Sequence, residues 1–413
     1  MKISREWQAR ILLLVTFGGL SLGLMVAAGE IAVRTRERNR NTPPGTLPLL
    51  FYRHARYGHA LVRNYDYFGW VHVNNHGFRG REVTIDKPDS VFRIMIVGSS
   101  TTFDSGVTGD EKAWPQRLEH WLGSMRPDLH PQVINAGVPG YRVTDNLLRL
   151  QAELYRFQPD VLVFYEGHND LFGSLRWTWE LAQGQGGGTP ERSGPWTPDE
   201  VPPITPWRHW LERHSLLYTK VAGRWEAIRS RARGRKMVAQ RVVPKGDTAT
   251  APVRPTVDQV GMTSDRFHRD MDAFLAVAGS LGIPVVLPEL VHVSGTGNVT
   301  EGDSIVRWMW ERAVPHGSVE TVLRTYTSFN DVLRALSSKR GATVIATAGF
   351  GLTGRHLYAD EDPIHFNDAG ADKMGRAMAQ ALLASGLLDS LNHARRATVE
   401  KSSSDMAYGA ARP

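Results

Sequence analysis

The stretch "VFRIMIVGSSTTFDSG", residues 91–106, decides how the rest of the chain is interpreted. An apolar run ends at a glycine and opens directly into four hydroxyl side chains, those of Ser99, Ser100, Thr101 and Thr102. A buried strand that ends in hydroxyl groups can cap a helix, hold a phosphate or present a nucleophile. Residues elsewhere in the sequence have to separate these three interpretations.

The composition is that of a folded, globular protein. The chain has 413 residues, of which 41% are hydrophobic and 22% are charged. This balance is not that of a disordered chain, and the length allows one large domain or two ordinary ones. The formal net charge is 49 − 42 = +7. The chain has no cysteine, which excludes disulfides, thiolate metal sites, cysteine nucleophiles and a lipid anchor on an N-terminal cysteine.

An uncharged apolar run, residues 11–29, lies near the N-terminus. At about 1.5 Å per residue, a helix of this length spans roughly the hydrocarbon core of a bilayer. We favour an uncleaved membrane anchor, because the run is longer than the ~7–15 residues of most signal-peptide cores. A signal peptide cleaved after Ala28 and a buried core helix remain open. Residues 1–40 are therefore predicted to be an anchor, or a signal peptide, with a basic flank.

From residue 91 onward, short apolar runs alternate with amphipathic stretches. Because the runs are apolar on both faces, they are typical of a mainly parallel five-stranded sheet covered by helices on both sides. In such sheets, ligands bind outside the carboxyl ends of the strands. The expected strands are 91–97, 131–137, 160–167, 283–290 and 342–348, and the expected helices are 111–125, 143–157, 264–281 and 367–386.

Several segments lie outside this alternation. Residues 41–90 show no sustained period and are predicted to be a connector and lead-in. The domain itself is expected over 91–390, with an insertion at 172–260 that contains some helix near 206–237, and a polar tail at 391–413 closes the chain. The insertion also contains six tryptophans, which could stack on sugar rings or contact acyl chains, although a small core of the insertion itself is the favoured explanation: Trp177, Trp179, Trp196, Trp207, Trp210 and Trp225.

The strongest concentration of positive charge lies in residues 224–245, which carry eight Lys and Arg and one Glu. A helix with this charge is suited to contact anionic lipid, although a solvated basic segment is at least as common. No nucleic-acid-binding module is recognised, so we expect no nucleic acid partner.

Ser100 is the first candidate for chemistry. Taken alone, a hydroxyl residue after a strand more often caps the next helix than acts as a nucleophile. A phosphate-binding loop is excluded, because the turn has one glycine and no lysine. The G-x-S-x-G turn of other hydrolases is also absent, because Thr102 stands where its second glycine is needed.

The second candidate is "DPIHF", in which Asp362 and His365 lie three positions apart before the last helix. A serine hydroxyl is a weak nucleophile until a base removes its proton, and histidine can do so near neutral pH. A carboxylate on the other ring nitrogen sets the tautomer and stabilises the imidazolium. In isolation, an ordinary Asp cap beside a loop His remains the commoner explanation.

Two further blocks follow the second and third expected strands: "NAGVPGYR" with Gly140, and "YEGHND" with Asn169. Acyl transfer builds negative charge on a carbonyl oxygen and needs hydrogen-bond donors set in advance. The N–H of Ser100, the N–H of a glycine in the first of these blocks (Gly137 or Gly140) and the amide of Asn169 are candidates for these donors. Each block taken separately is also explained by a plain turn or a helix cap.

In their order along the chain, "GSSTT", "NAGVPG", "GHND" and "DPIHFNDAG" resemble the SGNH (or GDSL) hydrolase family. The resemblance covers roughly 75–175 and 262–386, and it includes the lead-in "NNHGFRGRE". It implies a flavodoxin-like α/β/α sandwich and a serine that attacks an ester or acetyl group. No cofactor or metal is implied.

Mapped onto this chain, the resemblance makes Ser100 the nucleophile, His365 the general base and Asp362 its partner. Gly140 and Asn169 join the N–H of Ser100 in the oxyanion hole. Two positions depart from the family pattern: Ser99 replaces the aspartate of "GDS", and Asp104 stands where many relatives have glycine. Whether Asp104 adds charge to the site or caps a helix is left open, and Thr101 and Thr102 are expected to cap the helix that follows.

The favoured function is a membrane-anchored serine ester hydrolase that cleaves an ester or O-acetyl group of a glycan or a lipid. An O-acyltransferase acting on a glycan and a non-catalytic binding protein on the same fold remain as alternatives. The apolar run favours a single-pass anchor in the inner (cell) membrane, and the resemblance favours a catalytic domain outside the cytoplasm. The insertion follows the Asn169 block directly, so we expect it to cover or reshape the mouth of the site.

Overall fold

The computed structural model describes residues 5–39, 47, 50–182, 257–295, 304–313 and 318–397. From the segment between 182 and 257 it also describes residues 207, 210–211, 214–222 and 224–225. The chain divides into two compact units. One contains residues 1–50 and 202–249, and the other contains residues 51–201 and 250–413. The candidate site lies in the second unit.

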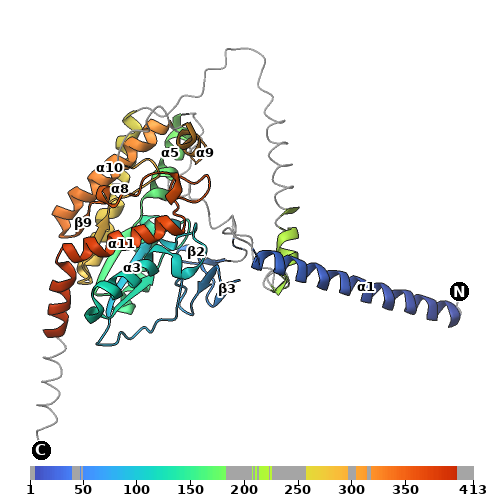
Figure 1. Cartoon of the computed structure of the whole chain (residues 1–413). Coiled ribbons are helices and arrows are strands. Elements are labelled where there is room, and N and C mark those ends of the chain that lie inside the picture. The colour runs from blue at the N-terminus through green and yellow to red at the C-terminus, as the bar shows by residue number, and fades with distance from the viewer. Residues whose placement is uncertain are drawn as a thin grey trace, which may run out of the picture. The chain divides into compact units, whose positions relative to one another are not determined.

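A five-stranded parallel sheet forms the centre of the second unit (Figure 1). This confirms the predicted fold class, and the order β6-β5-β7-β8-β9 places the first strand of the sheet beside the second and the third. Every residue of β5 and β7 is buried, which explains their unbroken apolar character. The strands are β5 (Phe92–Gly98), β6 (Pro131–Asn135), β7 (Val161–Tyr165), β8 (Val285–Pro288) and β9 (Thr343–Ile345).

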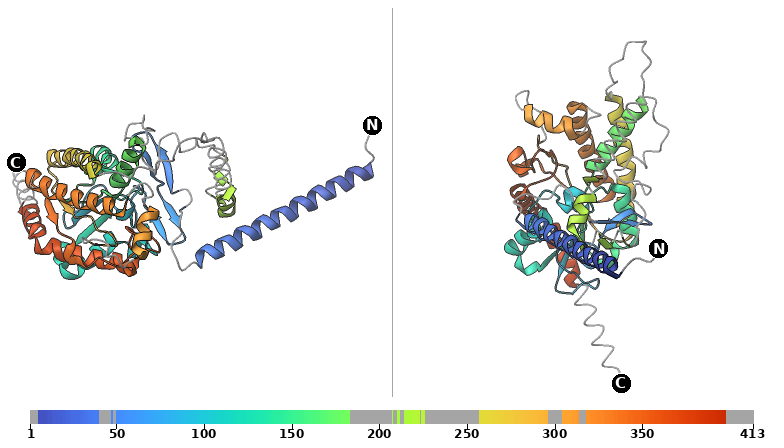
Figure 2. Two further views of the ribbon diagram at one scale, coloured as in Figure 1. Left: turned by 90° about the horizontal axis from the view of Figure 1, so that it is seen from above. Right: turned by 90° about the vertical axis from the view of Figure 1, so that its right-hand side faces the viewer.

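Helices cover both faces of this sheet (Figures 1 and 2). On one face, α3 (Trp114–Met125) packs against α11 (Asp368–Ala384). On the other, α8 (Val257–Ser280) packs against α10 (Val319–Arg340) and α4 (Val143–Ala152). Two more helices are α5 (His168–Ala182), which also contacts α8, and α9 (Ser304–Ala313).

Short helices connect these elements. The hydroxyl turn, residues 99–102, leads into α2 (Ser100–Phe103), and residues 387–397 are helical after α11. Short 3₁₀ turns are η1 (Asp110–Lys112), η2 (Pro127–Leu129), η3 (Leu154–Phe157), η5 (Ala348–Phe350) and η6 (Arg355–Leu357).

The lead-in contains regular structure that the sequence pattern did not show. Strands β1 (Phe51–His54) and β2 (Gly58–Leu61) pair antiparallel, as do β3 (Tyr65–Tyr67) and β4 (Val71–Val73). Strands of three or four residues are too short to establish an alternating pattern. Arg79 bridges β4 to Asn135 at the end of β6, so the lead-in reaches the edge of the central sheet.

Some predicted boundaries were wrong. The helix expected over 143–157 breaks at Glu153, and a separate 3₁₀ turn follows. The helix expected from 264 begins at Val257, and α5 continues to Ala182, into the start of the predicted insertion. Most of the remaining insertion, including the greater part of 206–237 and of the basic segment 224–245, lies outside the described residues.

The first unit contains α1 (Arg5–Arg38), a single long helix. Among the described residues it is the one helix long and apolar enough to cross a membrane. Its large hydrophobic side chains between residues 11 and 26 are exposed. Both a membrane anchor and a signal sequence fit this observation. In the same unit, the described part of 207–225 is helical except at Ser215.

Candidate active site

The turn after β5 exposes one hydroxyl residue among buried neighbours. Ser99, Thr101 and Thr102 are buried, whereas Ser100 is partly exposed at the start of α2. As the first residue of this helix, Ser100 has a backbone N–H with no partner inside the helix. Ser100 is therefore the hydroxyl residue of this turn that a substrate can reach.

The two threonines do not cap a helix, which corrects the prediction from sequence. The Thr102 hydroxyl donates to the carbonyl of Tyr165 at the end of β7 (2.9 Å). Thr101 Oγ1 is buried without a hydrogen-bond partner among the described residues. A Cβ atom at Gly98 would collide with both Thr102 and the Tyr165 carbonyl. This close approach explains why glycine ends β5, and the Thr102 bond ties the hydroxyl turn to the neighbouring strand.

The loop before α11 brings Asp362 and His365 into contact. Asp362 Oδ2 lies 2.7 Å from Nδ1 of His365, and Oδ1 accepts the backbone N–H groups of Ile364 and His365, each at 2.9 Å. Asn367 then caps α11 by accepting the N–H groups of Ala369 and Gly370. The carboxylate therefore orients both the backbone and the ring of His365.

The other ring nitrogen of His365 faces the hydroxyl turn. His365 Nε2 lies 2.8 Å from Ser100 Oγ, although the two residues are 265 positions apart in the chain. With Nδ1–H donating to Asp362, Nε2 is free to accept the serine proton. The structure thus brings together the three residues that the sequence proposed as a triad.

Charges around the histidine favour its protonated form. Burial alone would lower the pKa of His365, but the charge and hydrogen bond of Asp362, together with the charge of Asp104, raise it. Burial alone would raise the pKa of Asp362, but His365 and the two backbone N–H groups lower it to about 2. Asp362 is therefore ionised at neutral pH and is suited to stabilise an imidazolium.

Gly140 occupies a turn that only glycine adopts easily. Tyr141 N–H donates to the carbonyl of Val138 (3.1 Å), with Pro139 and Gly140 between them, and Gly140 has φ of 87°. Proline followed by a residue with positive φ is the pattern of a type II turn. His59 of β2 holds this turn, because its Nε2 lies 2.9 Å from the Pro139 carbonyl. Here a strand of the lead-in supports the candidate oxyanion donor.

Asn169 lies at the start of α5 and is partly exposed. Its Nδ2 donates to the carbonyl of Tyr141 (2.8 Å), so the third motif is tied to the turn of the second. The amide has a second hydrogen, which leaves a donor for another acceptor. Ser100, Gly140 and Asn169 all follow carboxyl ends of adjacent strands, β5, β6 and β7.

A comparison with protein-family models assigns part of this chain. Residues 96–304 match the model of the GDSL-like lipase/acylhydrolase family. The chain belongs to this family. The matched range contains Ser100, Gly140 and Asn169, whereas Asp362 and His365 lie beyond its end. A comparison with curated proteins finds no match.

Solved structures similar to this GDSL-like chain include three enzymes. Axe2, an acetylxylan esterase from Geobacillus stearothermophilus, is 14% identical and covers 71% of this chain and 94% of its own, with a TM-score of 0.38. The acetyl xylan esterase AlAXEase is 14% identical, with coverages of 71% and 98% and a TM-score of 0.38. LAE5, an α/β hydrolase from the metagenome of Lake Arreo, Spain, is 14% identical, with coverages of 72% and 95% and a TM-score of 0.38. At this level of similarity, the substrates of these enzymes are not transferred to this chain.

Asp104 performs both of the roles that the sequence left open in this GDSL-like domain. It ends α2 with φ of 66°, and its Oδ2 accepts the backbone N–H of Trp114, the first residue of α3 (2.8 Å). Its Oδ1 is buried and accepts no hydrogen bond within the described residues. Burial raises the pKa of Asp104 to about 7, despite the Trp114 N–H and the charges of Arg79 and His365. Asp104 is thus a helix cap and a second carboxylate acting on the histidine.

Arg79 supports α2, the helix that begins at Ser100, and this contact was not predicted from the sequence. Its buried guanidinium donates to the carbonyls of Phe103 (2.8 Å) and Asp104 (2.7 Å) and pairs with Asp110 (2.7 Å). These carbonyls belong to the last turn of α2, whose C=O groups have no helical partner. The lead-in motif "NNHGFRGRE" contains Arg79. Nothing in its spacing along the sequence indicates that Arg79 contacts the carbonyl of Asp104.

His168, inside the "GHND" motif, has a structural role. Its Nδ1 lies 2.7 Å from the hydroxyl of Tyr326, and burial lowers its pKa to about 3. The ring is therefore buried and neutral at ordinary pH. No group of three or more His, Asp or Glu side chains among the described residues could hold a metal ion.

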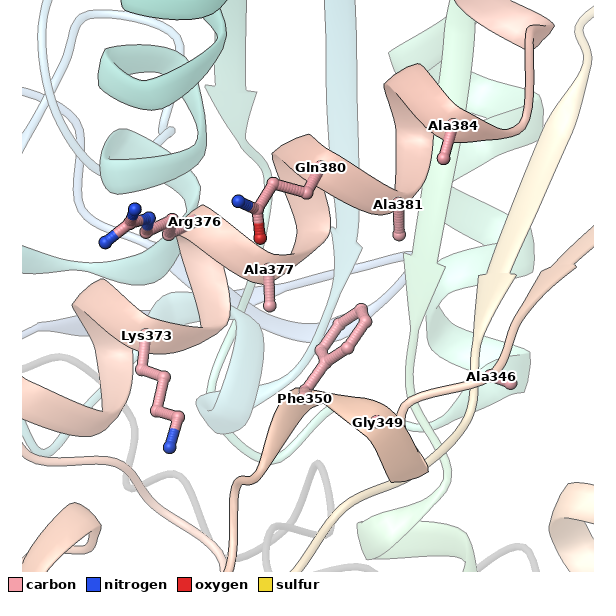
Figure 3. A pocket seen from close by; sticks show the side chains of 9 residues that line it. All are labelled: Ala346, Gly349, Phe350, Lys373, Arg376, Ala377, Gln380, Ala381 and Ala384. Atoms are coloured by element: carbon pink, nitrogen blue, oxygen red, sulfur yellow. The ribbon is translucent and has the colours of Figure 1, made fainter.

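A cavity of about 520 Å³ lies between η5 and α11 (Figure 3). Phe350 forms one side, and Lys373, Arg376 and Gln380 of α11 form the other. None of the triad or candidate oxyanion residues lines it. The cavity is therefore separate from the chemistry described above.

Proposed function

We propose that this protein is a serine esterase in which Ser100, His365 and Asp362 form the catalytic triad. The observation that carries the proposal is the continuous chain of hydrogen bonds from Asp362 to His365 (2.7 Å) and from His365 to Ser100 (2.8 Å). Both distances lie within the reach required of a nucleophile, its base and the group that orients the base.

In the first step, Ser100 Oγ attacks the carbonyl carbon of the ester while His365 Nε2 takes the hydroxyl proton. The carbonyl oxygen becomes an oxyanion, for which the N–H groups of Ser100 and Gly140 and the Nδ2 of Asn169 are the proposed donors. The ionised Asp362 stabilises the imidazolium that forms. The tetrahedral intermediate then expels the alcohol, which takes its proton from His365, and an acyl-serine remains.

In the second step, a water molecule attacks the acyl-serine. His365 Nε2 takes a proton from this water, and collapse of the second intermediate releases the carboxylic acid and returns the proton to Ser100. Hydrolysis needs no further residue. None of the described contacts favours an alcohol acceptor over water, so hydrolysis is the function we propose.

We also propose that α1 anchors the enzyme in a cell membrane, with the catalytic domain outside the cytoplasm. The support is the exposed apolar surface of α1 between residues 11 and 26. Water-exposed apolar surface of this extent is unfavourable, and a bilayer removes it from water. The substrate in this proposal is an ester or O-acetyl group of a glycan or lipid.

The test is hydrolysis of a short p-nitrophenyl ester by the detergent-solubilised, full-length protein. Ser100→Ala is expected to abolish turnover and labelling by a fluorophosphonate probe. Ser105→Ala is the matched control, because this hydroxyl lies five residues away on an exposed position. Equal rates for wild type and Ser100→Ala would refute the assignment of the nucleophile.

A further inference from the structure

The first unit contains a contact between two segments that are far apart in the sequence. Glu30 of α1 accepts hydrogen bonds from Ser215 Oγ and from the backbone N–H groups of Leu216 and Leu217, each at 2.9 Å. The described residues 216–222 are helical, so Glu30 supplies the cap for the start of this helix. A helix in the insertion is thus capped by a side chain of the N-terminal helix α1, and α1 is labelled in Figure 1.

More contacts follow along the same face of α1. Arg34 pairs with Glu30 (2.6 Å) and donates to the carbonyl of His214 (3.1 Å). Glu37, which is only 5% exposed, pairs with Lys220 (2.9 Å). Residues 30, 34 and 37 are spaced four and three apart, which places them on one side of a helix.

Apolar side chains also pack between α1 and the insertion helix. A Cβ atom on Gly29 would lie 2.9 Å from Leu217 Cδ2, so the leucine side chain rests on the glycine. Leu216 is also buried. The contact with the insertion therefore begins at residue 29, where the uncharged run of α1 ends, and it continues to residue 37.

The docked segment presents aromatic side chains to the outside. Trp207, Trp210 and Trp225 are each about 60% exposed, so the prediction from sequence that they form a small core was wrong for these three. Tryptophan is enriched at the interface between a bilayer and water, where the ring is in the headgroup layer. The exposed tryptophans thus belong to a segment docked immediately after the run that is long enough to cross a bilayer. Arg36 and Arg38 follow on α1 and add positive charge at the same end.

We propose that the described residues between 207 and 225 form a collar, docked on α1, that binds the surface of the lipid bilayer. Trp207, Trp210 and Trp225 lie among the lipid headgroups, and Glu30 holds the collar at the end of the span. This inference rests on the anchor in the proposed function and extends it. The insertion, which the sequence suggested as a cover for the active site, is then tied to the membrane at this collar.

Docking of the collar can be tested directly, because the chain has no cysteine of its own. The variant Gly29→Cys/Leu217→Cys, in the full-length protein in membranes, is expected to be joined by a short bis-maleimide. The joined peptides are detected by mass spectrometry. Gly19→Cys/Leu217→Cys is the control pair and is expected to remain unjoined, because Gly19 lies on the exposed part of α1. Equal joining in both pairs, or none in the first, would overturn the docking.

Contact with lipid is tested by reconstituting the full-length protein in phosphatidylcholine vesicles with bromine on the acyl chain close to the headgroup. Bromine quenches tryptophan fluorescence at short range. Trp7 of α1 is also exposed, so the proteins compared carry Trp7→Phe as well. We expect the triple variant Trp207→Phe/Trp210→Phe/Trp225→Phe to lose most of the quenching seen when these three tryptophans are in place. Glu30→Ala, which removes the cap, is expected to reduce quenching with these three tryptophans present. Glu6→Ala, at the other end of α1, is expected to leave it unchanged.

The outcomes separate the collar from the proposals on which it rests. If the protein resists carbonate extraction but the triple variant is quenched like the protein that keeps these three tryptophans, the collar is overturned and the anchor stands. If the mature chain begins at Gly29 and leaves the membrane with carbonate, both the anchor and the collar fail. Ester hydrolysis by the detergent-solubilised protein is measured in parallel. Absence of this activity would contradict the proposed triad and would leave the anchor and the collar unaffected.

Discussion

Asp362 holds His365 at two points: Oδ2 lies 2.7 Å from the ring Nδ1, and Oδ1 lies 2.9 Å from the backbone nitrogen of the same residue. One carboxylate thus sets both the position of the loop and the orientation of the ring. Because the spacing of three residues allows both bonds within one turn of chain, the acid and base of the proposed triad come from a single local motif. Only the nucleophile has to be supplied by another part of the fold.

Removing the charge of Asp362 should show how far the rate depends on this carboxylate, which orients the ring of His365. Asp362→Asn is expected to lower kcat on the order of 10⁴-fold, because the amide favours the wrong histidine tautomer. It also removes the main interaction that raises the pKa of His365, so the acidic limb of the kcat/KM profile should move to lower pH. Asp360→Asn, on an exposed position of the same loop, is the control. An unchanged rate in Asp362→Asn would contradict the assignment.

Asp104 should affect both stability and the pH profile. Burial raises its pKa from 3.8 to about 7, so the folded protein binds this proton more tightly than the unfolded chain. Its contribution to the free energy of unfolding therefore falls as pH rises from about 4 to 7. Asp104→Asn should remove this fall in a series of denaturant titrations, since an amide oxygen can still accept from Trp114 and Asn tolerates positive φ.

The Asp104→Asn variant should also change the pH dependence of kcat/KM. Without the Asp104 charge, the pKa of His365 should decrease, and the acidic limb of kcat/KM should move to lower pH. Structural damage alone would reduce the rate without moving this limb. A loss of activity with an unmoved limb would therefore show that Asp104 acts only as a cap.

The proposed oxyanion donors should affect the chemical step more than binding. Asn169→Ala is expected to lower kcat by about 10²–10³-fold with a smaller change in KM, because the donor acts on charge that appears in the transition state. Tyr141→Phe is the control, because it removes only the hydroxyl that donates to the His59 carbonyl and keeps the carbonyl that Asn169 contacts. Equal losses of kcat in both variants would indicate that Asn169 only holds the turn.

Arg79 should be needed for stability as well as for the position of the serine. Arg79→Gln leaves Asp110 and two carbonyls of the turn without a buried cation, which we expect to cost about 3–5 kcal/mol of unfolding free energy. Arg81→Gln removes an exposed ion pair with Glu119 and should cost less than about 1 kcal/mol. Thermal unfolding of the two variants measures the difference. Similar melting temperatures would contradict the role of Arg79.

The sequence alone determined the strands and the local motifs. Unbroken apolar runs identify buried parallel strands because both faces of such a strand are covered, and this pattern is visible without any tertiary contact. The spacing of Asp362 and His365 places them within one turn of chain, so their pairing could also be predicted. The short hairpins between residues 51 and 73 could not, because three or four residues establish no period.

Only the tertiary structure decided which distant residues meet. Ser100 and His365 approach to 2.8 Å across 265 positions because the sheet order and the packing of α11 on α3 bring the ends of two separate segments together. Thr102 binds a neighbouring strand instead of a helix end, and Arg79 reaches the carbonyl of Asp104, for the same reason. Local patterns in a sequence report burial and turns, whereas contacts between elements depend on how the whole chain packs.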